Sequence, residues 1–306
     1  MAITAAQVKE LREITGAGMM DCKKALVAVD GDMEKAVDFL RENGMMKAAK
    51  KSGRIASEGL VRFQFAEDGS AASIVEVNSE SDFVAKNDDF VAFVENLAKI
   101  GLASDKICEE CIKEKEYADG VNVGDTLVNL IATIGENMNI RRITKVATPG
   151  VKYVGYMHGG GRIGVIIGLK TDASVEEVTV CGKDVAMQAA SMRPKYVNES
   201  EVDPEYLAHE KEILVAQAKN ESPDKPEAII EKMIGGRLKK QLKEVCLVDQ
   251  AFVKDSSMSV AQYVESVAKQ LGKPVEVVEM VRYEVGEGLA KKEENFAEEV
   301  AKQMNA

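Results

Sequence analysis

The stretch LVRFQFAEDGSAASIVEVN, from Leu60 to Asn78, has the pattern of a β-hairpin. β-prone residues run from Leu60 to Phe65, a polar turn occupies Glu67 to Ser70, and a second run returns from Ser73 to Val77. β-branched and aromatic residues favour strands, whereas Asp and Gly favour tight turns. An apolar stripe at helical spacing follows in Phe90 to Leu97, so the pattern predicts a hairpin followed by a helix.

The same order of elements recurs later in the chain. VKYVGYMHGGGRIGVIIGL, from Val151 to Leu169, predicts two strands around a tight turn at His158 to Gly161, with a helix at Asp184 to Met192. A further helix is predicted at Val260 to Leu271 and a further strand at Val277 to Val285. The two copies predict an α+β fold with a duplicated core of antiparallel sheets, each with helices packed on one face.

The segment before the first hairpin predicts three short helices. Thr4 and Gln7 form a capping box for the first helix, and the second runs from about Met19 to Val29. Asp32 caps the third helix and Gly44 is predicted to stop it. The basic stretch from Lys47 to Arg54 is then predicted to be a solvated connector.

A long insertion in the second copy predicts a pair of helices. Pro204 stands at a first helical position after Asp203, the chain reverses near Ser222 and Pro223, and a second helix starts at Pro226. The resulting antiparallel arm can bury its apolar stripe only against itself or against another chain.

These patterns predict five parts of the chain. They are a three-helix domain (1–46), a basic linker (47–58), a first core subdomain (59–148), a second core subdomain (149–290) with its inserted arm (203–243), and an amphipathic C-terminal helical module (291–306).

Composition narrows the class of function. The net charge of -11 and the pI near 5.0 argue against direct binding of nucleic acid, which usually requires a basic face. The sequence has neither a signal-peptide pattern nor an apolar run long enough to span a membrane. We therefore expect a cytoplasmic protein with a protein or small-molecule partner.

The cysteines do not form the pattern of a disulfide-rich domain. Their number, five, is odd, and only Cys108 and Cys111 lie close together, in the sequence CEEC. A tetrahedral metal site needs about four ligands, and no second Cys or His pair stands nearby. We expect two free thiols on an acidic helix, with no metal and no cofactor.

Catalytic motifs are missing from the sequence. His158 and His209 stand in different predicted modules, and neither has a neighbouring Cys or Ser that would form an activated nucleophile. The sequence has no P-loop, and GGGRIG at Gly159 lies between two strands, where a dinucleotide fingerprint requires a following helix. The glycines therefore favour a hairpin turn.

Several motifs together resemble translation elongation factor Ts of the bacterial type. The two most specific are TGAGMMDCKKAL at Thr15 to Leu26 and SESDFVAKN at Ser79 to Asn87. The resemblance continues through IGENMNIRR from Ile134, HGGGRIGV from His158 and RYEVGEG from Arg282, and it covers essentially the whole chain in order.

This resemblance implies a guanine-nucleotide exchange factor for the GTPase EF-Tu, with no catalytic chemistry of its own. The factor would release GDP by displacing Mg²⁺ and disturbing the phosphate site, so that GTP can bind. The residues that match this exchange element of the family are Ser81, Asp82, Phe83 and Val84, with Ser81 standing where the family commonly has Thr.

The resemblance also implies further contacts with EF-Tu, through the C-terminal helix and through Met19, Met20, Ile134, Gly135, His158 and Gly159. It likens the first three helices to a ubiquitin-associated domain and the arm to a coiled coil that mediates homodimer formation. The residues themselves leave alternatives open. Met19 and Met20 suit a helix core, Phe83 suits a staple onto the next helix, Gly135 suits a simple turn, and the arm suits a solvated antenna.

Two other functions remain as alternatives at this point. One is an adaptor whose first three helices bind ubiquitin-like or other protein ligands without exchange activity. The other is a thiol or metal enzyme built on Cys108 and Cys111.

Overall fold

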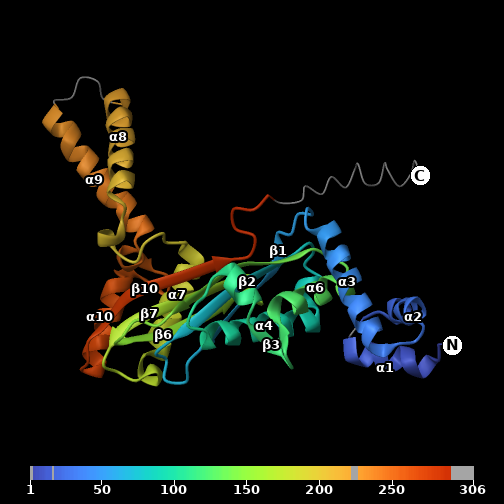
Figure 1. Ribbon diagram of the computed structural model, residues 1–306. Helices are drawn as coiled ribbons and strands as arrows, with labels where there is room; N and C mark the ends of the chain where they lie inside the picture. Colours follow the sequence, from blue (N-terminus) through green and yellow to red (C-terminus); the bar gives the residue numbers. More distant parts are fainter. Residues whose placement is uncertain (1–2, 16, 222–226, 291–306) are drawn as a thin grey trace. The chain divides into compact units, whose positions relative to one another are not determined.

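The computed structural model describes residues 3–15, 17–221 and 227–290. The internal contacts divide the chain into two compact units (Figure 1). Unit 1 comprises Met1–Gln64, Ser73–Lys145 and Tyr283–Ala306, and unit 2 comprises Phe65–Ala72 and Val146–Arg282. Each unit is built on its own three-stranded sheet with helices, which confirms the predicted α+β class. Within the described ranges, no helix has the length and apolar content needed to cross a bilayer.

Unit 1 begins with the three predicted helices, α1 (Ala5–Thr15), α2 (Met19–Ala28) and α3 (Met33–Lys51). They share a small core that includes Val8, Leu11, Cys22, Leu26 and Ala36. The predicted caps are also present. The Gln7 amide donates to Thr4 Oγ1 at 3.3 Å, and the Lys35 amide donates to Asp32 Oδ1 at 3.1 Å.

The end predicted for the third helix is wrong, because α3 continues past Gly44 to Lys51. Gly44 is buried, and a Cβ at this position would lie 3.7 Å from Val128 Cγ1 and 3.8 Å from the Ala132 Cβ. The glycine therefore allows α3 to pack closely on a later helix, and residues 47–51 of the expected linker are helical.

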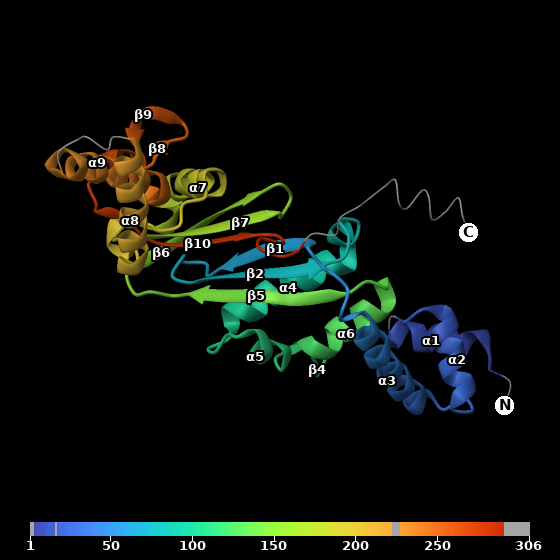
Figure 2. The same ribbon diagram turned by 90° about the horizontal axis from the view of Figure 1, so that it is seen from above.

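The sheet of unit 1 has the order β1-β2-β5, with β1 at Glu58–Phe65, β2 at Ala72–Ser79 and β5 at Met138–Val146. The first predicted hairpin is thus confirmed as β1 and β2. Helices α4 (Asp88–Ala103) and α6 (Val123–Ile134) share one apolar core with this sheet (Figure 2). The shorter elements of the unit are η1 (Val84–Lys86), α5 (Glu109–Lys113), β3 (Glu116–Ala118) and β4 (Val121–Asn122).

A buried carboxylate joins β2 to β5 and to the segment after the last strand. Glu76 is fully buried, because Val75 and Val77 on either side point into the apolar core and alternation turns Glu76 to the other face. Its oxygens accept from Arg141 Nη1 at 3.0 Å, from Arg142 Nε at 2.5 Å and from the amide of Gly286 at 2.8 Å. Two of the motifs quoted above, IGENMNIRR and RYEVGEG, therefore meet at one side chain.

Unit 2 has a sheet of order β10-β7-β6, with β6 at Val151–His158, β7 at Ile163–Thr171 and β10 at Val275–Glu284. Strands β6 and β7 are antiparallel, with His158 opposite Ile163, so the glycine turn between them is confirmed as a hairpin turn. Helices α7 (Val175–Met192) and α10 (Val260–Leu271) share a core with the sheet. The shorter elements are η2 (Glu199–Glu201), η3 (Leu247–Asp249), β8 (Ala251–Phe252) and β9 (Asp255–Ser259).

The start of α7 differs from the prediction, which placed the helix at Asp184 to Met192. The helix begins at Val175, because Ser174 and Glu177 form a capping box in which the Ser174 amide donates to Glu177 Oε2 at 2.8 Å. This capping box is a short-range signal that the sequence itself carries.

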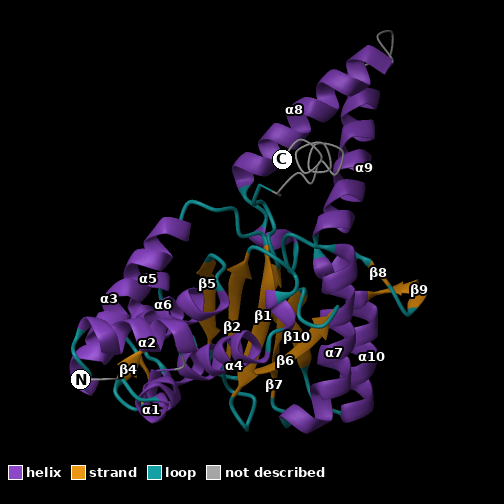
Figure 3. Ribbon diagram, turned by 90° about the vertical axis from the view of Figure 1, so that its right-hand side faces the viewer, coloured by secondary structure: helices purple, strands orange, loops and turns teal. Residues whose placement is uncertain are grey.

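The predicted arm of unit 2 consists of α8 (Pro204–Glu221) and α9 (Glu227–Val245), which lie side by side (Figure 3). They share an apolar seam of Leu214, Ala218, Ile230 and Ile234. The Glu205 amide donates to Asp203 Oδ1 at 2.8 Å, as expected for a helix that starts at Pro204. The reversal near Ser222 and Pro223, the start at Pro226 and the C-terminal helical module expected at 291–306 lie outside the described residues.

Candidate functional site

The loop after β2 points two neighbouring side chains in opposite directions. Phe83 is 79% exposed, whereas Val84 is 4% exposed and packs in the core that α4 and α6 form with the sheet. Val84 begins the short helix η1, and Asn87 then caps α4 by accepting from the amides of Asp89 and Phe90. The buried valine thus anchors the loop while the phenylalanine ring stands in solvent.

The exposed ring excludes one interpretation of the sequence. The alternative interpretation made Phe83 a hydrophobic staple that packs on the following helix. The exposure of its side chain shows that this interpretation is wrong. Burying a Phe side chain is worth roughly 1.5–3 kcal/mol, so an exposed ring leaves that free energy available to a partner. The Lys86 ammonium lies 6.0 Å from the ring centroid and pairs with Asp82 Oδ2 at 2.7 Å.

Two carboxylates fasten this loop to the loop after α6. Glu136 accepts from the Ser81 amide at 2.9 Å and from Ser81 Oγ at 2.6 Å. Glu80 accepts from the Asn137 amide at 2.6 Å, in the reverse direction. We call these four residues, Glu80, Ser81, Glu136 and Asn137, the loop clasp. Because the clasp has bonds in both directions, it fixes the backbone on which Phe83 stands.

The clasp brings two of the predicted contact segments together. Gly135 ends α6 with φ 92°, and its amide donates to Ile131 O at 3.0 Å, so the turn predicted there is present. A residue with a Cβ is strained at this φ, which accounts for glycine between Ile134 and Glu136. Ile134 is half-buried against the core of unit 1. The clasp therefore places the loop of Ser81 to Val84 beside the loop that follows Ile134 and Gly135.

Met19 and Met20 begin α2, in the same unit as the clasp. Their residue type favours a helix core, but Met19 is 55% exposed and Met20 is 64% exposed, so that interpretation is wrong. The core of the three helices is filled instead by Leu11, Cys22 and Leu26, which face inward. Two flexible apolar side chains are thus left on the surface, where Met adapts well to a partner.

His158 and Gly159 lie in the hairpin turn of unit 2. Gly159, Gly160 and Gly161 all have positive φ, at 59°, 68° and 111°, which explains three successive glycines. The Tyr156 hydroxyl and His158 Nδ1 lie 3.1 Å apart, within hydrogen-bond distance. The turn presents an exposed imidazole at the end of a regular hairpin.

The structure adds two residues, Glu80 and Glu136, to those predicted from the sequence. Both stand within motifs quoted above, SESDFVAKN and IGENMNIRR, next to residues of the predicted site. The two loops are separated by more than fifty positions in the sequence. No local pattern therefore indicates that each glutamate accepts hydrogen bonds from the other loop.

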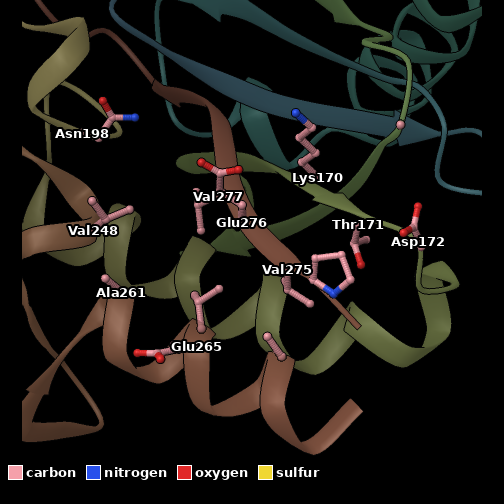
Figure 4. Close-up of a pocket in the computed structure, with 14 residues that line it drawn as sticks. Lys170, Thr171, Asp172, Asn198, Val248, Ala261, Glu265, Val275, Glu276 and Val277 are labelled. Atoms are coloured by element: carbon pink, nitrogen blue, oxygen red, sulfur yellow. The ribbon is translucent and has the colours of Figure 1, made fainter. Parts of the chain in front are cut away.

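A pocket in unit 2 has none of these residues in its lining (Figure 4). It has a volume of about 670 Å³, with apolar walls from Val248, Val275 and Val277. Lys170 and Glu276 add charge to its lining. None of the predicted site residues lines it.

The expectation for the close cysteine pair is wrong. Cys108 and Cys111 form a disulfide with their Cα atoms 5.0 Å apart, because a spacing of three residues at the start of α5 brings their Cβ atoms within reach. Free thiols are found at Cys22, Cys181 and Cys246, which are all buried.

Glu136→Ala is expected to loosen the clasp. The substitution removes both acceptors of Ser81, so we expect a loss of about 1–2 kcal/mol of stability from these bonds. Hydrogen exchange of the Ser81 amide should become faster than in the wild type, while the amides of β6 and β7 keep their protection. Unchanged protection of Ser81 would show that Glu136 does not hold the loop.

An exposed aromatic ring on a braced loop, with exposed methionines in the same unit, is typical of a surface that binds another protein. The geometry thus favours a protein that binds another protein. Sequence comparisons then specify the family. The profile of the family Elongation factor TS matches residues 80–287. The elongation factor Ts of Clostridioides difficile is 56% identical over 302 residues, covering 99% of both chains.

Two further relatives agree with this assignment. The elongation factor Ts proteins of Clostridium novyi and Clostridium kluyveri are 52% and 53% identical, and each alignment covers 99% of both chains. The chain belongs to the elongation factor Ts family. Members of this family are nucleotide-exchange factors of protein synthesis, and they do not catalyse chemistry of their own.

Proposed function

We propose that this chain promotes guanine-nucleotide exchange on EF-Tu, and that Phe83 is the group that disturbs the nucleotide site. The ring enters EF-Tu beside the bound nucleotide and shifts the segments that hold Mg²⁺ and the phosphates. Mg²⁺ neutralises the charge of the phosphate oxygens, so its displacement weakens the binding of GDP. GTP then binds to the emptied site. The same proposal places the protein in the cytoplasm.

The single observation that supports this mechanism best is the 79% exposure of Phe83 on a loop fixed at both ends. Val84 anchors the loop from within the core, and the clasp bonds of Glu80 and Glu136 restrain it from the side. A rigid loop loses little conformational entropy on binding, so more of the free energy of ring insertion is available to distort the partner.

The remaining predicted residues act as further contacts in this proposal. Met19 and Met20 supply adaptable apolar surface, Ile134 and Gly135 present the second loop of the clasp, and His158 and Gly159 present the hairpin turn of unit 2. Asp82 supports the ring position through its ion pair with Lys86. The C-terminal module at 291–306 is a further proposed contact, and homodimer formation through the arm is part of the same proposal. The domain boundaries given above from the sequence are part of this proposal too.

Linkage sets a requirement on the mechanism. If the factor lowers the affinity of EF-Tu for GDP by a given ratio, then GDP lowers the affinity of EF-Tu for the factor by the same ratio. Each tenfold effect corresponds to about 1.4 kcal/mol. Exchange therefore passes through a ternary complex, and the docking surface fits the nucleotide-free GTPase best.

The direct test is the release of a fluorescent GDP analogue from EF-Tu. Substoichiometric amounts of the chain should accelerate release over many turnovers, and excess GDP should displace the chain from nucleotide-free EF-Tu in a pull-down. A chain that binds EF-Tu equally well with and without GDP would contradict the proposal.

A further inference from the structure

The Cys108–Cys111 disulfide lies at the first turn of α5, on the surface of unit 1. Cys108 is exposed and Cys111 is half-buried. The other three cysteines are buried, and burial raises the pKa of the Cys181 thiol to about 12 and that of the Cys246 thiol to about 11. Carboxylates near each thiol add to the rise in pKa, with Asp184 near Cys181 and Asp249 near Cys246. Only one pair of sulfurs is thus accessible for exchange in the folded protein.

This disulfide contributes little to holding the fold together. It closes a loop between residues only three positions apart, and in the chain-entropy account a disulfide stabilises the fold less the shorter the loop that it closes. The segment has other attachments, since Ile112 is fully buried in the core and the Val123 amide donates to Lys115 O at 2.9 Å. The bond can therefore open while α5 stays in place.

The local geometry favours Cys108 as the reactive sulfur once the bond is reduced. Cys108 Sγ accepts a hydrogen bond from the Cys111 amide at 2.9 Å, and a hydrogen bond of this kind stabilises a thiolate. Among the described residues, no three His, Cys, Asp or Glu side chains are placed to hold a metal ion, so the pair lacks the further ligands of a zinc site.

We propose that Cys108 and Cys111 form a reversible dithiol–disulfide site that exchanges with low-molecular-weight disulfides. In the oxidising direction, the Cys108 thiolate attacks one sulfur of the small disulfide, whose S–S bond breaks and releases a first small thiolate. The Cys111 thiolate then attacks the Cys108 sulfur and releases a second small thiolate. Water protonates both released thiolates. The protein sulfurs lose two electrons and the small disulfide gains them.

The site is independent of the proposed exchange activity, because it requires no EF-Tu. The test uses the full chain, equilibrated with either reduced or oxidised glutathione and then treated under native conditions with a maleimide. Mass spectrometry should find two labels, on Cys108 and Cys111, after the reduced treatment and none after the oxidised treatment. Persistence of both labels after oxidised glutathione would overturn the proposal.

Single-serine variants assign the attacking sulfur. Cys111→Ser should trap glutathione on Cys108 as a mixed disulfide, because the resolving thiol is absent, and Cys108→Ser should trap it on Cys111 at least tenfold more slowly. Equal rates of capture would refute the role given to Cys108. Circular dichroism checks that both variants fold, and Cys22, Cys181 and Cys246 should take label only after denaturation.

Discussion

Phe83→Ala is expected to slow factor-stimulated GDP release from EF-Tu by about 30-fold, which corresponds to the roughly 2 kcal/mol of an interface hot spot. The ring makes few contacts within the chain, since it is 79% exposed, so its removal should change the stability of the free protein by less than about 0.5 kcal/mol. Stopped-flow fluorescence of a labelled GDP measures the first quantity, and thermal unfolding measures the second.

The matched control is Val180→Ala. Val180 is also apolar and 68% exposed, but it lies in α7 of unit 2, whereas Phe83 lies in unit 1. With this variant, GDP should leave EF-Tu at the same rate as with the wild-type factor. If both variants stimulate GDP release from EF-Tu as well as the wild type does, Phe83 is not the group that acts on the nucleotide site.

Glu76→Gln is expected to destabilise the chain by about 3 kcal/mol at pH 7, because it leaves Arg141 and Arg142 without the charge they surround. Burial alone would raise the pKa of Glu76. The hydrogen bonds from the Gly286 amide, Asn78 and Arg141, together with the charge of Arg142, outweigh it and hold this pKa below its usual range. Chemical denaturation compares the two proteins.

The pH dependence follows from the direction of that shift. A carboxyl with a lowered pKa in the folded state stabilises the protein above its unfolded-state pKa of about 4.3, and this contribution disappears as pH falls through the folded-state value. The stability gap between wild type and Glu76→Gln should thus be full at pH 7 and narrow below about pH 4.

Glu95→Gln is the control for this variant. Glu95 is 52% exposed and lies 3.4 Å from Arg62 Nε, so its loss should cost less than about 1 kcal/mol. A pH-independent gap for Glu76→Gln would show that the carboxylate is not ionised in the folded protein.

Much of the fold was predictable because its signals are local. Alternating β-prone residues around Asp68 and Gly69 gave the first hairpin, and three glycines gave the turn of the second. Pro204 after Asp203 marked the start of α8. Each of these signals lies within a few residues of the structure that it forms.

Two of the wrong predictions have the opposite property, because distant residues decide them. Gly44 looks like a helix stop, yet it is the contact point of α3 with Val128 and Ala132, more than eighty positions later. Met19 and Met20 have the composition of a core, but which face of a short helix is buried depends on the other two helices.

The candidate site has both local and distant features, and only the local ones could be predicted from the sequence. The resemblance of one continuous motif predicts Phe83 and its neighbours as the exchange element, and the buried Val84 explains why the ring of Phe83 is left in solvent. The loop clasp joins two separate motifs, through bonds of Glu136 with Ser81 and of Glu80 with Asn137. No spacing rule within either motif indicates these hydrogen bonds.

The most direct measurement of the central claim is the rate of GDP release from EF-Tu at different Mg²⁺ concentrations, with wild type and Phe83→Ala compared. If the ring acts by displacing Mg²⁺, a chelator performs that step in its place. The gap of about 30-fold between wild type and Phe83→Ala should then shrink to within a few-fold when Mg²⁺ is removed. A gap that stays the same at every Mg²⁺ concentration would contradict it.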